Sequence, residues 1–139
     1  MTIPEIIKKR GSARTRINYQ DGWYKELNQL LKLNDLFPEK ESLIEITLKE
    51  AKEIVRILLQ KRIAFSVEMM SFKEASEYTN LLFSGINETE CRCFTNGRWM
   101  DYKQSCSFGF NAFTDSTFDG GVLISSRDTN FCFWIEEED

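Results

Sequence analysis

Histidine is absent from this chain of 139 residues, and that absence excludes several classes of enzyme. A chain without imidazole has no Ser-His-Asp triad, no Cys-His pair and no His-ligated metal. It also lacks the side chain that most often acts as a general base near neutral pH. Catalysis would depend on carboxylates, Lys, Cys or Tyr, and no spacing of these residues predicts an active site. We therefore expect a protein that is not an enzyme and needs no cofactor.

Long apolar runs are also absent from the sequence. No stretch approaches the ~20 residues that a membrane helix needs. Residues 1–20 carry charges and lack the apolar centre of a signal peptide. The chain is 42% hydrophobic and 29% charged, which is typical of a folded domain. Together these features predict a cytoplasmic protein.

Only four cysteines are present, and their positions favour buried thiols over a metal site. Cys91 and Cys93 alternate along one predicted strand, while Cys106 and Cys132 fall on other predicted strands. Structural zinc sites usually place cysteines about two to four residues apart on a turn. Cysteines in the middle of a strand behave more often as small hydrophobic residues. We therefore expect no metal at these positions.

Three segments show the spacing of amphipathic helices. Apolar residues recur at helical spacing after Asp21, and the capping boxes Thr47–Glu50 and Ser71–Glu74 precede two further apolar stripes. In such a box the first side chain accepts the amide of the fourth residue, whose carboxylate reaches back. The pattern predicts helices over about 22–34, 48–59 and 72–83.

Strand patterns occupy most of the remaining sequence. Short β-branched or alternating segments predict strands at 43–46 and 62–69, and everything after Gly85 has the pattern of a sheet. The strands expected there include 107–113, 122–125 and 131–135. The predicted fold class is α+β, with N-terminal helices packed on a C-terminal antiparallel sheet. Residues 1–20 form a basic N-terminal arm whose structure the pattern does not define, and residues 21–139 form a single α+β domain.

Asn96-Gly97 predicts a β-hairpin, because both residues tolerate the positive φ of a type I′ turn. A two-residue loop would pair Thr95 with Arg98. The same register places two pairs of opposite charge across from each other, namely Arg92–Asp101 and Glu90–Lys103. It puts Phe94 opposite Trp99 on the polar face of the hairpin. The other face, which we assign to the core, carries Cys91, Cys93, Met100 and Tyr102.

Charge is distributed unevenly along the chain, whose formal net charge is −4. Residues 1–84 carry 14 basic and 12 acidic residues, whereas residues 85–139 carry 4 basic and 10 acidic ones. The basic residues crowd toward the N-terminus, and Glu136 to Asp139 close the chain. Such asymmetry indicates either a charged partner or two chain ends that screen each other.

The acidic end of the predicted sheet is the candidate partner-binding surface. Carboxylates there would steer association with a basic partner, and aromatic side chains would supply buried area. The predicted binding residues are Phe94, Trp99, Asp115, Asp119, Asp128, Trp134, Glu136, Glu137, Glu138 and Asp139. The partner would be a protein with a basic active site, such as a toxin or nuclease domain.

Two alternatives use other residues. The basic arm could bind nucleic acid or nucleotides, with phosphate contacts from Lys8, Lys9, Arg10, Arg14 and Arg16 and stacking on Tyr19. A long duplex would, however, be repelled by the acidic domain, whose isoelectric point is about 5.0. The second alternative is a magnesium enzyme in which Asp115, Asp119 and Glu136 meet at one sheet edge. No local spacing requires such a site.

The sequence from Thr117 to Val122, followed by Phe133 to Asp139, resembles the small cytosolic immunity proteins of bacterial toxin systems, including the contact-dependent-inhibition type. Many of these are single acidic α+β domains of this size without catalytic groups. The resemblance covers the last quarter of the chain and assigns no role to a specific residue. It implies a protein-binding inhibitor that neutralises a toxin or nuclease by covering its active site. A phage-encoded inhibitor of a bacterial defence nuclease would have a similar sequence.

Overall fold

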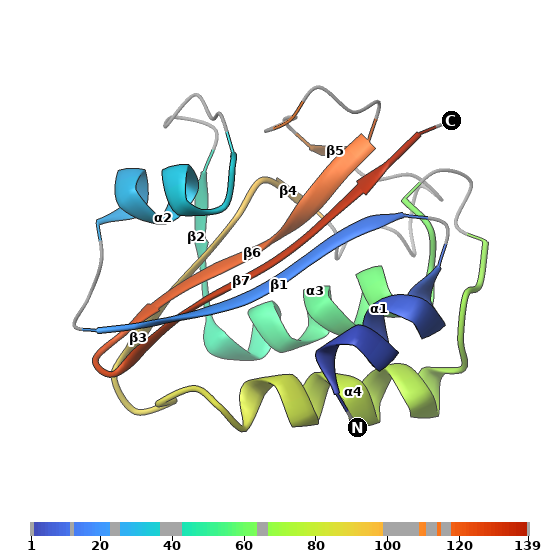
Figure 1. The fold of residues 1–139 in the computed structure, drawn as a ribbon, viewed down its shortest axis with the longest axis horizontal. Coiled ribbons are helices and arrows are strands. Elements are labelled where there is room, and N and C mark those ends of the chain that lie inside the picture. The colour runs from blue at the N-terminus through green and yellow to red at the C-terminus, as the bar shows by residue number, and fades with distance from the viewer. Residues whose placement is uncertain are drawn as a thin grey trace.

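The fold was analysed in a computed structural model, which describes residues 2–11, 13–22, 26–36, 43–63, 67–98, 109–110, 114 and 118–138. A five-stranded antiparallel sheet runs through the molecule, with helices on both of its faces (Figure 1). The fold is α+β, as the sequence predicts, with most of the helices before the long C-terminal strands. No helix within the described ranges has both the length and the apolar character needed to cross a membrane.

The main sheet has the strand order β1-β7-β6-β3-β2, and every neighbouring pair is antiparallel. Its strands are β1 (Arg14–Asp21), β2 (Ile44–Ile46), β3 (Cys91–Thr95), β6 (Phe118–Ser126) and β7 (Thr129–Glu137). The two nine-residue strands β6 and β7 form a central hairpin, and apolar residues on both faces suit them to that place. A separate small sheet pairs β4 (Gly97–Arg98) with β5 (Gly109–Phe110).

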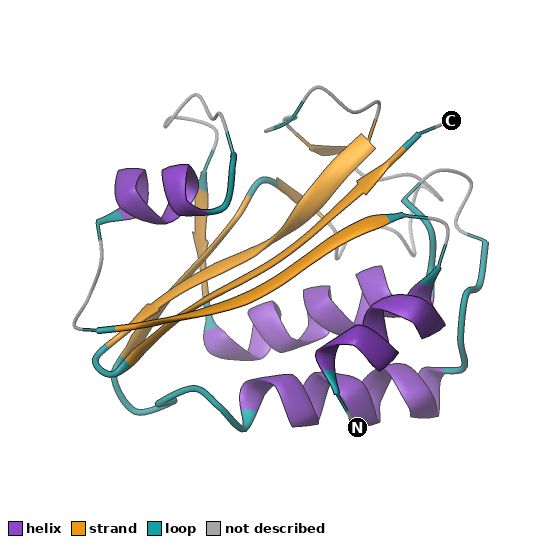
Figure 2. Ribbon diagram, in the orientation of Figure 1, coloured by secondary structure: helices purple, strands orange, loops and turns teal. Residues whose placement is uncertain are grey.

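One face of the sheet is covered by three helices, α1 (Ile3–Arg10), α3 (Leu48–Gln60) and α4 (Phe72–Phe83) (Figure 2). The predicted capping boxes begin α3 and α4: Thr47 Oγ1 accepts the Glu50 amide, and Ser71 Oγ accepts the Glu74 amide. α1 begins at Thr2, with a proline in its first turn, and ends at Gly11, whose φ of 56° suits glycine. The helix layer and the sheet enclose the larger core.

The opposite face of the sheet carries a smaller apolar cluster under α2 (Leu27–Leu33). Its members are Leu31, Leu36, Phe94, Leu123, Cys132 and Trp134, with Leu27 and Leu43 packed against them. β6 and β7 are therefore buried on both faces, and β3 contributes Phe94 to this cluster and Cys93 to the larger core. This explains why Phe131 to Ile135 carries apolar residues at every position.

Several local predictions are wrong. Asn96-Gly97 does not form a hairpin, because β3 pairs with β2 and β6 and the β4 strand that follows pairs with β5. Arg92 consequently pairs with Glu45 on β2, and Glu90 pairs with Arg127. No strand spans the described parts of 62–69, where Lys61 and Glu68 form an isolated bridge. Trp99 to Lys103 and Cys106 lie outside the described residues.

Residues before Asp21 are part of the fold, which the sequence pattern did not predict. Residues 3–10 form α1 against the core, and residues 14–21 form the strand β1 beside β7. The helix predicted over 22–34 begins later, at Leu27, with Glu26 as its N-cap. It ends at Asn34, as expected.

Candidate protein-docking edge

The charged ends of the chain are joined to each other inside the molecule. The Arg10 guanidinium pairs with the Glu137 carboxylate, and both side chains are fully buried. Arg10 also donates to the carbonyls of Leu58 (2.6 Å) and Lys61 (3.1 Å), while Glu137 accepts the Ile63 amide at 2.7 Å. Burial lowers the pKa of Arg10, and the adjacent Glu137 opposes that effect. This ion pair ties α1 to the end of β7 and to the end of α3.

A second set of end-to-end contacts lies on the α2 face of the sheet. Arg16 Nη1 lies 2.8 Å from Glu136 Oε2, and Arg14 Nε lies 3.7 Å from the same oxygen. Away from that face, Arg62, which follows α3, donates to the backbone carbonyl of Glu138 at 3.1 Å. The basic and acidic ends therefore screen each other, which was one of the two interpretations of the charge asymmetry.

Asp119 organises a buried polar cluster beside these contacts. Its Oδ1 accepts the Trp134 indole Nε1–H and the Asn96 amide, each at 3.2 Å. Its Oδ2 accepts the amide (3.0 Å) and the hydroxyl (2.8 Å) of Thr114. Four donors are directed at one buried carboxylate, which therefore serves to hold β6, β7 and the residues after β3 together.

Five of the seven predicted partner-binding residues that the structure describes are buried. Trp134 and Asp119 are 0% exposed, and Phe94 and Glu136 are also buried. Each of these carboxylates and aromatic rings is used within the fold, so the expected exposure of these side chains is wrong. Asp128 and Glu138 are exposed, as expected. Asp115, Trp99 and Asp139 lie outside the described residues.

The basic residues are likewise used within the fold. Arg10, Arg14 and Arg16 contact Glu137 or Glu136, and Lys9 lies 3.2 Å from Glu74. The Tyr19 hydroxyl donates to the Leu82 carbonyl, and its ring packs 5.0 Å from that of Phe131. Arg10, Arg16 and Tyr19 are thus engaged with protein groups, whereas Lys8, Lys9 and Arg14 remain exposed.

The predicted magnesium ligands are only partly brought together. Asp119 and Glu136 are register partners on β6 and β7, which lie inside the sheet and not at its edge. Both already bind donors or cations of the chain. No group of three or more possible metal-ligating side chains occurs within the described residues. Burial raises the pKa of Cys93 and of Cys132 to about 12, which keeps these thiols protonated near neutral pH.

The outer edge of β1 is not occupied by the contacts described above. β1 is eight residues long and lies at the end of the strand order, with β7 as its one neighbour among the described strands (Figure 1). The Gly22 N–H donates to the Asp128 carbonyl at 3.1 Å, and this pair continues the register of the β1–β7 ladder. Hydrogen bonding alternates along antiparallel strands, so the even-numbered residues of β1 bind β7.

The odd-numbered residues Thr15, Ile17 and Tyr19 therefore direct their backbone N–H and C=O groups away from the sheet. Apart from the ladder, no backbone or side-chain hydrogen bond of the described residues reaches these groups. Prolines, bulges and charged side chains are common devices for protecting an edge strand; β1 has no proline or bulge, and its two arginines are paired with Glu136 of the neighbouring strand. It is a regular edge on which another strand can add.

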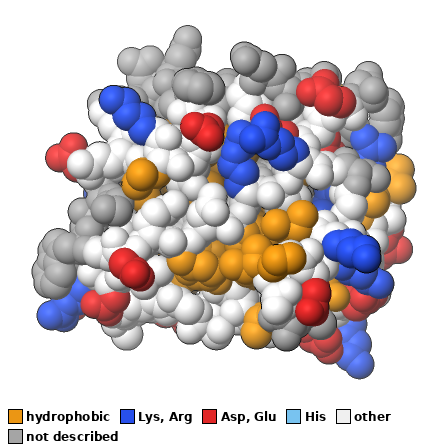
Figure 3. All heavy atoms as spheres, viewed as in Figure 1, with side chains coloured by type: hydrophobic (Ala, Val, Ile, Leu, Met, Phe, Trp, Pro, Cys, Tyr) orange, Lys and Arg blue, Asp and Glu red, His pale blue; other side chains and the backbone are white. Residues whose placement is uncertain are grey.

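An apolar band accompanies this edge. Viewed as in Figure 1, hydrophobic side chains form a continuous band alongside β1 and over the helix layer (Figure 3). The partly exposed apolar residues of α1, of β1 and of the link between them that pack on the core are Ile3, Ile7, Ala13 and Tyr19. Backbone groups available for pairing and an adjacent apolar strip together make a surface suited to an extended protein segment.

The sequence did not predict this edge. Arg14 to Asp21 alternates only weakly between polar and apolar residues, and the charge of residues 8–16 favoured an arm. The useful signal was the alternation of Thr15, Ile17 and Tyr19, all β-branched or aromatic.

Comparisons with known proteins found no relative of this chain. No family model matches the chain, and neither a curated protein nor a solved structure matches it.

Proposed function

We propose that this chain is a binding protein that acts by covering a surface of another protein, and that the partner adds a strand to the free edge of β1. The observation that carries the proposal is the outward direction of the Thr15, Ile17 and Tyr19 backbone groups beside the apolar band. Main-chain hydrogen bonds would supply affinity, and side-chain contacts along the band would supply specificity.

We take the class of partner, a toxin or nuclease domain, from the resemblance of the C-terminal quarter to immunity proteins. In this proposal the chain neutralises that domain by blocking its active site. The docking surface differs from the one expected from sequence, because Asp119, Glu136 and Glu137 have partners inside the fold. The exposed Arg14 lies on this edge strand instead, so we expect the contacted segment to be neutral or acidic.

The test uses a pair of variants at one position. Thr15→Pro removes an outward N–H without breaking the ladder to β7, whereas Thr15→Val changes the side chain and keeps that N–H. Wild type and both variants are used to capture proteins from a lysate of the native host. A candidate partner is then purified, and its affinity for each variant is measured by calorimetry.

The proposal predicts that Thr15→Pro binds at least about tenfold more weakly than Thr15→Val. Equal affinities of the two variants would exclude docking at the β1 edge. The inhibitory role is tested separately by adding the chain to the purified partner at equal concentration. Binding that leaves the partner's activity unchanged would exclude neutralisation while keeping the docking edge.

A further inference from the structure

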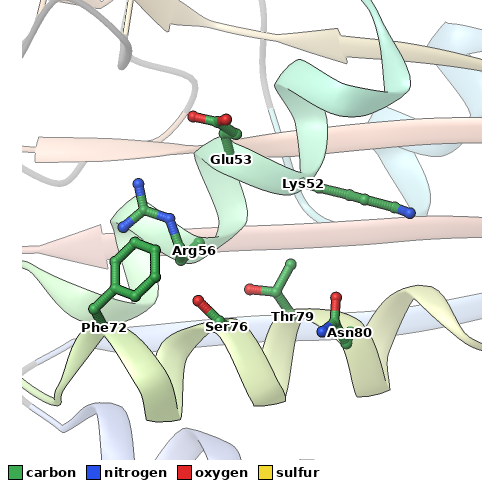
Figure 4. A pocket seen from close by; sticks show the side chains of 7 residues that line it. All are labelled: Lys52, Glu53, Arg56, Phe72, Ser76, Thr79 and Asn80. Carbon is green, nitrogen blue, oxygen red and sulfur yellow. The ribbon is translucent and has the colours of Figure 1, made fainter.

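A groove between α3 and α4 lies apart from the β1 edge and takes no part in the docking proposal. Its volume is about 370 Å³, within the range of small-molecule sites. Figure 4 shows the side chains that line it, namely Lys52, Glu53 and Arg56 from α3 and Phe72, Ser76, Thr79 and Asn80 from α4.

Arg56 is the centre of the groove. Its guanidinium carbon lies 4.5 Å from the centre of the Phe72 ring, and Nη1 donates to Gln60 Oε1 at 2.8 Å. The stacked ring and the amide fix the plane of the guanidinium, so its remaining N–H groups keep a defined direction. Gln60 in turn donates to Glu68 at 3.1 Å, which places an amide between Arg56 and that carboxylate.

Arg56 has no ion-pair partner among the carboxylates of the described residues, whereas Lys52 has one in Glu88 at 2.6 Å. Arg56 is also partly buried, and burial lowers its pKa while Glu53 opposes the effect. A partly desolvated cation without a bound carboxylate is stabilised by any anion that reaches it.

Neutral donors on α4 face the same space. Ser76 and Asn80 occupy one side of α4 at positions four residues apart, and their side chains turn toward α3 (Figure 4). No hydrogen bond of the described residues engages the Ser76 hydroxyl or the Asn80 amide. Thr79 differs, because its hydroxyl already donates to the Ala75 carbonyl at 2.8 Å.

We infer that the α3–α4 groove binds a small aromatic molecule that carries a phosphate or carboxylate group. Arg56 binds the oxyanion through its planar fork, and Ser76 and Asn80 donate to its remaining oxygens. Phe72 is 59% exposed, so its ring is available to an aromatic group of the same ligand.

The test follows backbone and Arg56 Nε–H signals by NMR while phenyl phosphate, benzoate or inorganic phosphate is added up to about 20 mM. Shifts that saturate and map to Arg56, Ser76 and Asn80 support the site. Tighter binding of phenyl phosphate than of benzoate identifies phosphate as the preferred group, and the reverse order identifies carboxylate. Tighter binding of phenyl phosphate than of inorganic phosphate supports the aromatic contact with Phe72.

Two variants remove one positive charge each from α3. Arg56→Gln should weaken binding of the preferred aromatic anion at least about tenfold, while the exposed control Lys49→Gln should leave it nearly unchanged. Arg56→Lys keeps the charge but loses the fork, so intermediate binding is expected. Equal weakening by Arg56→Gln and Lys49→Gln, or the absence of saturable shifts in the groove, would overturn the inference.

Discussion

Arg10 and Glu137, 127 positions apart in sequence, form a fully buried ion pair that closes the N-terminal helix onto the last strand. The other contacts of this pair are also structural: the Arg10 side chain donates to carbonyls at the end of α3, and Glu137 accepts the Ile63 amide. The charges at the chain ends are thus part of the folded core. These charges are therefore not available to a partner in the folded protein.

Breaking this pair is expected to destabilise the fold strongly. Arg10→Ala or Glu137→Ala should each lower the free energy of unfolding by about 3–5 kcal/mol, because the remaining charge stays buried without its partner. The double variant should cost clearly less than the sum of the single variants. Urea denaturation measures all three. Arg14→Ala is the control, since the Arg14 side chain is 72% exposed and its ion pair should contribute less than about 1 kcal/mol.

Removal of the Asp119 carboxylate is expected to loosen the α2 face of the sheet. Asp119→Ala leaves the Trp134 indole N–H and the Asn96 amide buried without their acceptor, at a cost of about 2–4 kcal/mol. The measurement is urea denaturation followed by tryptophan fluorescence. Asp128→Ala, which removes an exposed carboxylate bonded to Asn87, should change stability by less than about 1 kcal/mol. Similar losses in the two variants would contradict the role given to Asp119.

Gly121 is required by the close approach of β6 to β7. A Cβ added at this position would lie 1.8 Å from the Phe133 carbonyl oxygen, and that backbone cannot move without breaking the ladder. Gly121→Ala should therefore abolish folding or cost more than about 3 kcal/mol, measured by circular dichroism and thermal unfolding. At Gly85 the nearest atom is a Tyr19 ring carbon at 3.1 Å, so Gly85→Ala should be tolerated far better.

The cysteines supply a pH-dependent prediction. Because burial raises the pKa of Cys93 and Cys132 to about 12, neither thiol ionises at pH values near 8. Iodoacetamide should leave both unmodified in the native protein at about pH 8 and should modify both in urea, as read by mass spectrometry of peptides. Rapid native alkylation of Cys132 would contradict its complete burial.

The sequence predicted those parts of the fold that depend on contacts between neighbours in the chain. The capping boxes at Thr47 and Ser71 are local hydrogen bonds, and they begin α3 and α4 as expected. The burial of Phe131 to Ile135 on both faces of the sheet was also predictable from their continuous apolar run. These signals need no knowledge of which strands become neighbours.

Strand pairing was not predictable in the same way. Asn96-Gly97 is a strong local turn signal, yet contacts with β2 and β6 decide where Thr95 pairs. The predicted exposure of the binding residues was wrong for a related reason. The sequence shows that Glu136 and Arg16 are charged, but it does not show that they face each other. The free edge of β1 is a property of strand order, which only the assembled sheet contains.

The central claim is that the odd-numbered backbone groups of β1 are available to a partner. Amide hydrogen exchange, read residue by residue by NMR on the isolated protein, tests this most directly. We predict that the amides of Thr15, Ile17 and Tyr19 exchange at least about tenfold faster than those of Arg16, Asn18 and Gln20, and that a bound partner protects them. Equal protection of both sets in the isolated protein would contradict the free edge.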